Sequence, residues 1–191
     1  MKPAISKKSI NKVLEMVYLF LFAVFVLIAM LGTTKFNIVW PEYFYADLRS
    51  ILLLVIIMKT CVGENYDIWD LILIFVIGSV FLLNINRSGY EDFELILLLI
   101  IGAKNINLKS IVRVYFTVTF VLLIITICSA LTGHIENLIY FQEGRRSRMS
   151  LGIGYPTDFA AYIFYDAIAY IYIRGRKIKY FELAVLFAAG V

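Results

Sequence analysis

The sequence predicts an all-α fold, a polytopic integral membrane helix bundle of about six to seven transmembrane helices. Of its 191 residues, 62% are hydrophobic, whereas roughly 45–50% is usual for a soluble domain. The mean hydropathy is +0.86. The apolar runs are continuous, as in helices that cross about 30 Å of hydrocarbon, and do not alternate with polar residues as barrel strands do.

Seven apolar runs between charged residues are the candidate spans. In order, they cover residues 13–31, 44–62, 68–83, 93–103, 111–131, 159–173 and 180–191. The first is too long for the apolar core of a signal peptide, and no small-residue cleavage pattern follows it. The fourth is shorter than the roughly 18 residues of a typical span, but the charges beyond it require a change of side. The last stops with the chain at Val191, so we expect residues 1–191 to be a single transmembrane domain, the truncated N-terminal part of a longer polytopic protein.

The distribution of positive charge predicts a cytoplasmic N-terminus. In that orientation the inner segments hold twelve of the 18 Lys and Arg residues, as the positive-inside rule requires. The outer six are Lys35, Arg49, Arg87, Arg145, Arg146 and Arg148. Three of these lie within four positions of the longest loop, residues 132–158, which we expect to be extracytoplasmic. A local exception to the rule indicates that this charge serves a site.

The composition excludes several kinds of soluble chemistry. A net charge of +4 does not imply a nucleic-acid partner. Cys61 and Cys128 lie in apolar runs, so we expect two buried free thiols. His134 is the only histidine, which argues against a zinc site or a histidine triad. The spacing of Asp67 and Asp70 weakly resembles that of the aspartate-rich magnesium sites of membrane prenyltransferases. The preferred interpretation is that the two residues lie at a solvated helix start. We expect no metal and no cofactor.

The arginine-rich loop suits a phosphate. Arg145, Arg146 and Arg148 lie in the segment EGRRSRMSLGIGYPTDFAAYIFY. A guanidinium presents a rigid fork of donors that matches phosphate oxygens, and it loses hydration more readily than an ammonium. Lysine is the commoner cation outside the loop, so the choice of arginine here has a chemical explanation. The alternative is contact with anionic lipid headgroups.

A glycine-spaced turn follows the arginines and leads into a helix. Gly152 and Gly154 permit unusual backbone angles, and Pro156 suits the first turn of a helix. Tyr155 or Thr157 would cap that helix. Its positive end would then face the outer side and attract an anion.

Polar residues recur along one face of that helix. Asp158, Tyr162, Tyr165 and Asp166 are spaced i, i+4, i+7 and i+8, which places them on one stripe. Asp158 is either a helix cap or a catalytic group. Asp166 lies about two turns further in, where an ionisable group faces a cavity or a partner; it either forms a structural hydrogen bond or takes part in the chemistry.

The segment RMSLGIGYPTDFAAY resembles the R-x-S-L-G-x-x-[H/Y]-P motif of Wzy-type polymerases, and residues 100–116 resemble an inner hairpin of Gram-positive members. The matching positions are Arg148, Ser150, Leu151, Gly152, Tyr155 and Pro156. Many members carry histidine before the proline and asparagine after it. Tyr155 and Thr157 replace them here, so a histidine general base is not expected.

The resemblance implies a membrane glycosyltransferase of the bacterial plasma membrane. It would join undecaprenyl-diphosphate-linked repeat units into capsular polysaccharide, exopolysaccharide or O-antigen, in contact with membrane lipids and other polysaccharide-assembly proteins. Arg148 and Asp158 are the predicted catalytic residues. The predicted substrate-binding residues are Arg145, Arg146, Ser150, Gly152, Tyr155, Tyr162 and Asp166.

Three alternatives stay open at the level of sequence. An O-antigen ligase uses the same donor with another acceptor. A transporter or flippase would use the arginine loop to recruit a phosphate-bearing substrate without chemistry. An inactive truncated fragment would have no function beyond residence in the membrane.

Overall fold

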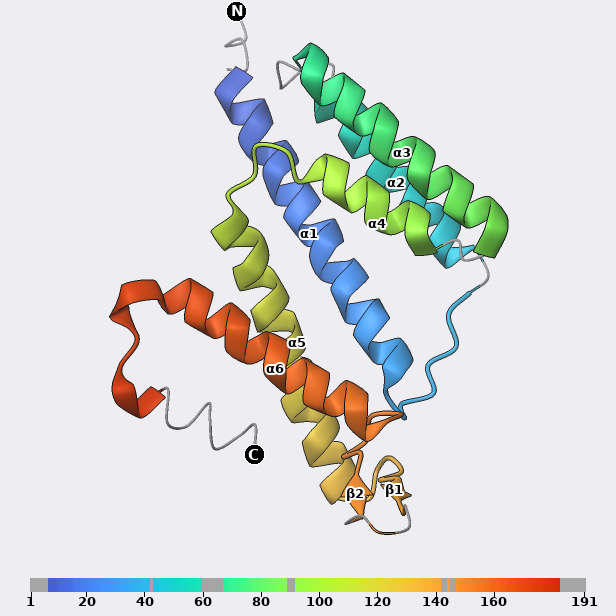
Figure 1. Cartoon of the computed structure of the whole chain (residues 1–191), viewed down its shortest axis with the longest axis vertical. Coiled ribbons are helices and arrows are strands. Elements are labelled where there is room, and N and C mark those ends of the chain that lie inside the picture. Colours follow the sequence, from blue (N-terminus) through green and yellow to red (C-terminus); the bar gives the residue numbers. More distant parts are fainter. Residues whose placement is uncertain are drawn as a thin grey trace, which may run out of the picture. The chain divides into compact units, whose positions relative to one another are not determined.

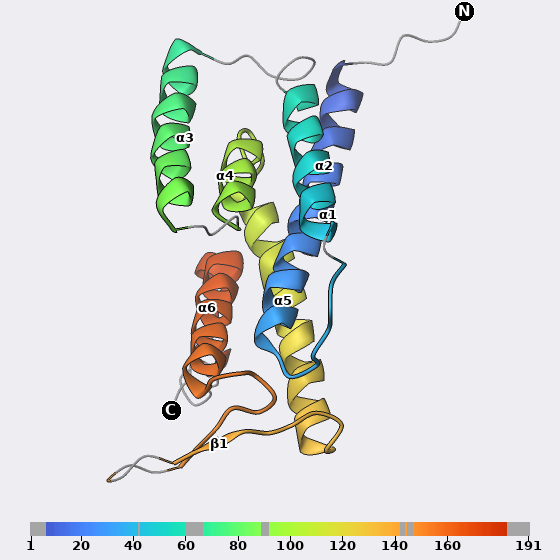
Figure 2. The same ribbon diagram turned by 90° about the vertical axis from the view of Figure 1, so that its right-hand side faces the viewer.

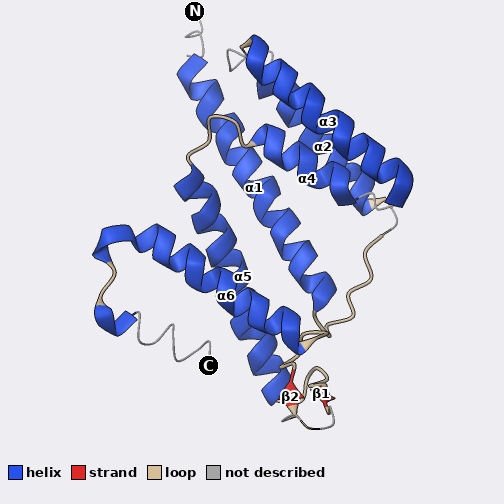
Figure 3. Ribbon diagram, in the orientation of Figure 1, coloured by secondary structure: helices blue, strands red, loops and turns tan. Residues whose placement is uncertain are grey.

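The computed structural model describes residues 7–41, 43–59, 67–88, 92–141, 144 and 147–182. These residues form a mostly helical fold, as predicted, with one short hairpin (Figures 1 and 3). In chain order the elements are α1 (Lys7–Thr33), α2 (Phe44–Met58), α3 (Ile68–Ser88), α4 (Asp92–Gly102), α5 (Leu108–Leu131), β1 (Ile139–Tyr140), β2 (Arg148–Met149), α6 (Pro156–Arg174) and the 3-10 helix η2 (Gly175–Lys177).

Two helices are long and apolar enough to cross a membrane. They comprise Ser9–Thr33 of α1 and Leu108–Leu131 of α5, with 25 and 24 residues. At about 1.5 Å per residue, each extends about 36 Å, which exceeds the thickness of the hydrocarbon layer. The predicted total of six to seven spans stays a prediction, because α2 has 15 residues and α4 has 11. Of the predicted last span, residues 183–191 lie outside the described residues.

The chain divides into two compact units. The first comprises Met1–Phe22 and Trp40–Ile106, and the second comprises Ala23–Val39 and Asn107–Val191. Helix α1 therefore contributes its first part to one unit and its second part to the other. Each unit is described by itself below.

The first unit is built on α4, which packs against both α2 and α3. Helix α2 buries one stripe of side chains at helical spacing, Leu48, Leu52, Val55 and Ile56. At the end of α4, Gly102 leaves room for the aromatic ring of Tyr18 from α1. The Tyr18 hydroxyl donates a hydrogen bond of 2.7 Å to the carbonyl of Leu99.

A buried lysine closes the end of α4. The Lys59 side chain is only 4% exposed. Its Nζ donates to the carbonyl oxygens of Gly102 and Lys104, at 2.7 and 2.9 Å, and lies 5.5 Å from the ring centroid of Tyr18. The carbonyls at a helix C-terminus have no partners within the helix, and a cation both satisfies them and complements the helix dipole. Lys59 thus joins the end of α2 to the end of α4.

Asp67 and Asp70 both act at the start of α3. Oδ1 of Asp67 accepts a hydrogen bond from the backbone of Ile68, and Oδ2 of Asp70 accepts one from the backbone of Asp67, at 2.6 and 2.8 Å. Asp70 also forms an ion pair with Lys104. Within the described ranges, no group of three or more side chains could hold a metal ion. These contacts agree with the helix-start interpretation of the two aspartates.

The second unit packs the last part of α1 with α5 and α6. Helices α5 and α6 lie side by side (Figures 1 and 2). A buried cluster joins Met30 of α1, Leu122 and Leu123 of α5, and Ile153 of the segment before α6. Phe159 of α6 packs against the same cluster. The glycine-spaced turn is thus part of the core.

We expect Gly102→Ala to lower the stability of the first unit by about 1–3 kcal/mol. An added Cβ would lie 2.6 and 2.9 Å from two atoms of the Tyr18 ring, so the ring must move and its hydrogen bond must lengthen. Gly78→Ala in α3 is the matched control, because nothing lies within 4 Å of its added Cβ and alanine favours a helix by about 1 kcal/mol. Thermal unfolding of the purified protein measures both. An equal change in Tm for the two variants would contradict the packing of Tyr18 on Gly102.

Candidate functional site

The loop that carries the predicted phosphate site forms a short hairpin. Strands β1 and β2 pair antiparallel, with Ile139 opposite Met149 and Tyr140 opposite Arg148. The Arg148 side chain is exposed. The other two predicted arginines, Arg145 and Arg146, lie outside the described residues. The hairpin lies at the end of the second unit where α6 begins (Figure 2), and Arg148 belongs to its second strand.

Backbone hydrogen bonds connect the turn after β2 to the end of α1. Lys35 N donates to the carbonyl of Gly152 at 2.8 Å, and Gly154 N donates to the carbonyl of Thr33 at 2.7 Å. These bonds pair Ile153 with Thr34 as an isolated antiparallel bridge. This contact could not be predicted from local sequence patterns, because the paired residues are far apart in the chain. It also brings Lys35, a second outer cation of the predicted topology, to the same end of the unit as Arg148.

Position 152 requires glycine for two reasons, its backbone conformation and the atoms packed around it. Its φ is +85°, and an added Cβ would lie 2.6 Å from Cδ1 of Ile135 and 3.0 Å from Cγ2 of Thr126. The left-handed region is accessible to glycine with little strain. The backbone of the turn therefore packs directly on α5 and on the segment that follows it.

Ser150 is buried beneath the same turn. Its side chain is fully buried, and its backbone N donates to the carbonyl of Leu138 at 2.9 Å. Ile153 N in turn donates to the carbonyl of Ser150 at 3.0 Å. Two of the predicted substrate-binding residues, Ser150 and Gly152, thus have packing contacts here; their role in binding stays a prediction.

Helix α6 begins as the sequence predicts. Tyr155 occupies the N-cap position with an extended backbone, and its side chain makes no capping hydrogen bond. Pro156 is the first helical residue and Asp158 lies in the first turn. The Tyr155 ring is exposed and lies 6.0 Å, centroid to centroid, from the ring of Tyr140. The Tyr140 hydroxyl donates to the carbonyl of Gly154 at 2.7 Å, so an aromatic pair flanks the start of α6.

The predicted polar stripe of α6 meets two different helices. The hydroxyls of Tyr162 and Thr33 of α1 are 3.1 Å apart and share a hydrogen bond. Asp166 is 5% exposed, and its Oδ1 accepts a hydrogen bond from the hydroxyl of Thr119 of α5. Tyr165, by contrast, is 55% exposed. Tyr162 and Asp166 of the stripe therefore form internal hydrogen bonds, whereas Tyr165 faces outward.

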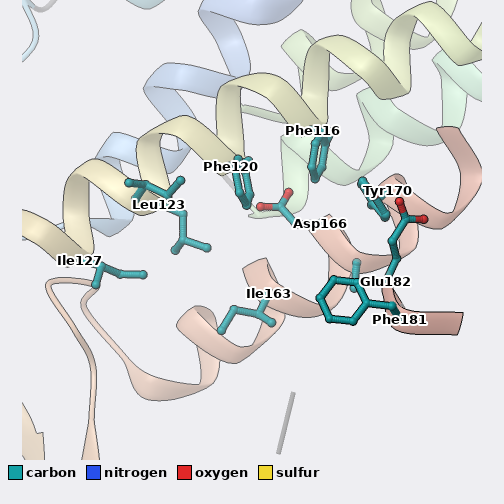
Figure 4. Close-up of a pocket in the computed structure, with 11 residues that line it drawn as sticks. Phe116, Phe120, Leu123, Ile127, Ile163, Asp166, Tyr170, Phe181 and Glu182 are labelled. Carbon is teal, nitrogen blue, oxygen red and sulfur yellow. The ribbon is translucent and has the colours of Figure 1, made fainter. Parts of the chain in front are cut away.

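Sequence reasoning missed the threonine partners and a cavity. Thr33 and Thr119 are polar residues inside otherwise apolar helices, which was the available signal for them. Asp166 lines a cavity of about 390 Å³ that has mostly aliphatic and aromatic walls (Figure 4). No pattern in the sequence indicated this cavity, because its walls come from α5, α6 and the segment after η2.

No protein-family model, curated protein or solved structure matches this chain.

We expect Gly152→Ala to destabilise the second unit by more than Gly133→Ala does. Gly133 also has a positive φ, +78°, but nothing lies within 4 Å of its added Cβ. The Gly133 variant thus measures backbone strain alone, of order 1 kcal/mol, and the Gly152 variant adds the clash with Ile135 and Thr126. Chemical or thermal unfolding compares the two variants. Equal losses of stability would mean that the turn does not pack on α5.

Proposed function

We propose that this chain is a membrane glycosyltransferase that polymerises undecaprenyl-diphosphate-linked oligosaccharide repeat units at the outer face of a bacterial plasma membrane. One observation carries the proposal: the turn of the R-x-S-L-G motif is fastened to the end of α1, with Arg148 directly before it and Asp158 shortly after it. Together with the resemblance to Wzy-type polymerases, a fixed turn between an exposed arginine and a carboxylate supports the proposal.

The helix directions in the second unit support a multi-pass topology. The end of α1 bonds to the turn before α6, and Gly152 in that turn packs on Thr126, towards the end of α5. Helices α1 and α5 therefore end on one side, and α6 starts there. If α1 and α5 both cross the membrane, an odd number of crossings must separate them, and α2, α3 and α4 would supply three. This topology would be consistent with the cytoplasmic N-terminus that the positive-inside rule predicts.

The exposed apolar surface of the helices supports a membrane location. Many large apolar side chains are exposed on the helices, among them Phe120, Leu131 and Phe164. A soluble monomer rarely exposes large contiguous apolar patches. Hydrocarbon is the environment in which these side chains carry no cost.

The proposed reaction is a single transfer of a glycosyl group. An acceptor hydroxyl attacks the anomeric carbon of the growing chain, the bond from that carbon to the diphosphate oxygen breaks, and lipid diphosphate leaves. Arg148, together with Arg145 and Arg146, would neutralise the charge that develops on the diphosphate. The positive end of the α6 helix dipole would add to this field. Asp158 would accept the proton of the acceptor hydroxyl.

The remaining predicted residues would hold the sugars. Tyr155 and its neighbour Tyr140 expose an aromatic pair that suits the apolar face of a sugar ring. Tyr162 and Asp166 continue inward from this end. The arginines would take the place of a counter-cation, so the proposed reaction requires neither a metal nor a nucleotide cofactor. Other polysaccharide-assembly membrane proteins would be partners.

We expect Arg148→Ala to collapse the surface glycan from a ladder to single repeat units. Loss of one preorganised donor slows such a transfer by on the order of 10²- to 10³-fold. Arg148→Lys should give an intermediate ladder, because a point charge replaces the bidentate fork. The variants are placed at the chromosomal locus of the source strain, and the glycan is separated on a gel. Arg176→Ala, an exposed arginine of η2, is the matched control and should leave the ladder unchanged.

Three results would contradict this function. An unchanged ladder in Arg148→Ala, with normal protein levels, would assign the arginines to lipid contact. Loss of repeat units from the outer face altogether would instead indicate a transporter or flippase. Normal polymer that is no longer joined to its final acceptor would indicate a ligase.

The topology has its own test. We expect Ile38→Cys and Ser147→Cys to react with a membrane-impermeant maleimide added to intact cells, because both lie on the proposed outer side. Lys109→Cys, at the start of α5, should react only after the cells are opened. Cys61 and Cys128 are first replaced by alanine. Labelling of Lys109→Cys in intact cells would overturn the proposed orientation.

A further inference from the structure

The second unit contains a cavity whose walls are almost entirely apolar. It has a volume of about 390 Å³ and lies among α5, α6 and the residues after η2 (Figure 4). Four aromatic rings contribute to it, from Phe116, Phe120, Tyr170 and Phe181. Phe116 lies 5.2 Å from Phe120 and 5.8 Å from Tyr170, between ring centroids. The volume falls within the roughly 300–1,000 Å³ of small-molecule sites.

One carboxylate oxygen in this cavity is left without a partner. Asp166 is almost completely buried, with only 5% of its surface exposed. Oδ1 accepts the hydrogen bond from Thr119, whereas Oδ2 has no hydrogen-bond partner within the part of the chain that the structure describes. A buried polar atom without a partner is unfavourable and therefore requires an explanation. A donor supplied by a ligand in the cavity would provide one.

The other carboxylate of the cavity is already satisfied. Glu182 forms an ion pair with Arg174, and it accepts a hydrogen bond of 3.0 Å from the backbone of Lys179. Arg174 also lies 5.9 Å from the ring centroid of Tyr170. Among the described residues that line the cavity there is no lysine, arginine or histidine. Oδ2 of Asp166 therefore lacks a hydrogen-bond donor, and a positively charged donor would suit it best.

We propose that this cavity binds a hydrophobic molecule that carries one protonated amine. The ammonium would donate to Oδ2 of Asp166, and the apolar part would fill the space between the aromatic rings, whose faces attract cations. A hydrocarbon chain would leave the oxygen unpaired. A neutral alcohol would donate a hydrogen bond but would not balance a charge in apolar surroundings. An anion would meet the carboxylate directly. The proposal shares Asp166 with the predicted sugar-binding residues, but it does not depend on glycosyl transfer at the start of α6.

The test compares three probes of the same shape and different charge. They are 4-phenylbutylamine, 4-phenylbutanol and 4-phenylbutyrate, titrated calorimetrically into the full chain in phosphatidylcholine nanodiscs, with empty nanodiscs as the blank. We expect the amine to bind at least about tenfold more tightly than the alcohol, with no binding of the carboxylate. Equal affinity for amine and alcohol, or binding of the carboxylate, would overturn the proposal.

Two variants assign the binding to this cavity. Asp166→Asn keeps the shape and removes the charge, so amine affinity should fall to that of the alcohol. Asp158→Asn is the matched control, because it removes a carboxylate from the same helix outside the cavity, and amine binding should persist. Ala167→Phe fills the cavity while Asp166 stays intact, and it should also abolish binding. Circular dichroism and thermal unfolding verify that each variant is folded.

The outcomes separate this site from the proposed function. Arg148→Ala should retain amine binding, whatever its effect on polymer. Amine binding that survives both Asp166→Asn and Ala167→Phe would overturn the proposal and leave the glycosyltransferase proposal untouched.

Discussion

The docking of one glycine-containing turn on the end of α1 organises the second unit. Two backbone hydrogen bonds, from Lys35 to Gly152 and from Gly154 to Thr33, hold the turn in place. Its centre, Ile153, is fully buried in the cluster that joins α1 and α5. Because Gly152 has no side chain, the backbone can pack directly on Thr126. The hairpin before the turn and the helix after it are positioned by this contact.

Inside the helices, polar side chains pair with one another or with backbone carbonyls. Tyr162 pairs with Thr33, Tyr18 with Leu99, and Lys59 with the end of α4. Such pairing is expected where neither water nor another polar group is available, because an unpaired polar atom in apolar surroundings is costly. Among the described residues, Oδ2 of Asp166 departs from this pattern, and outside the helices so do Oγ of Ser150 and Nε1 of Trp40. The departure at Asp166 lies beside an apolar cavity and is the basis of the proposed ligand site.

The start and the middle of α6 therefore differ in chemistry. At its start, the cations Arg148 and Lys35 lie near the positive end of the helix dipole, where the proposed phosphate site would be. In its middle, Asp166 lies beside aromatic rings, where the proposed amine would bind. The two proposed sites would thus prefer ligands of opposite charge, about two helical turns apart.

Several helices could be predicted from local features of the sequence. Continuous apolar runs located α1, α5 and α6, and Pro156 located the beginning of α6, because these signals are local to the chain. The sequence also singled out Asp166 as an ionisable group in an apolar helix. Only the tertiary structure showed that Ser150 and Gly152 are buried, that Lys35 joins the arginine end, and that Thr119 binds Asp166. These facts depend on contacts between residues far apart in the chain, which are set by packing and not by local pattern.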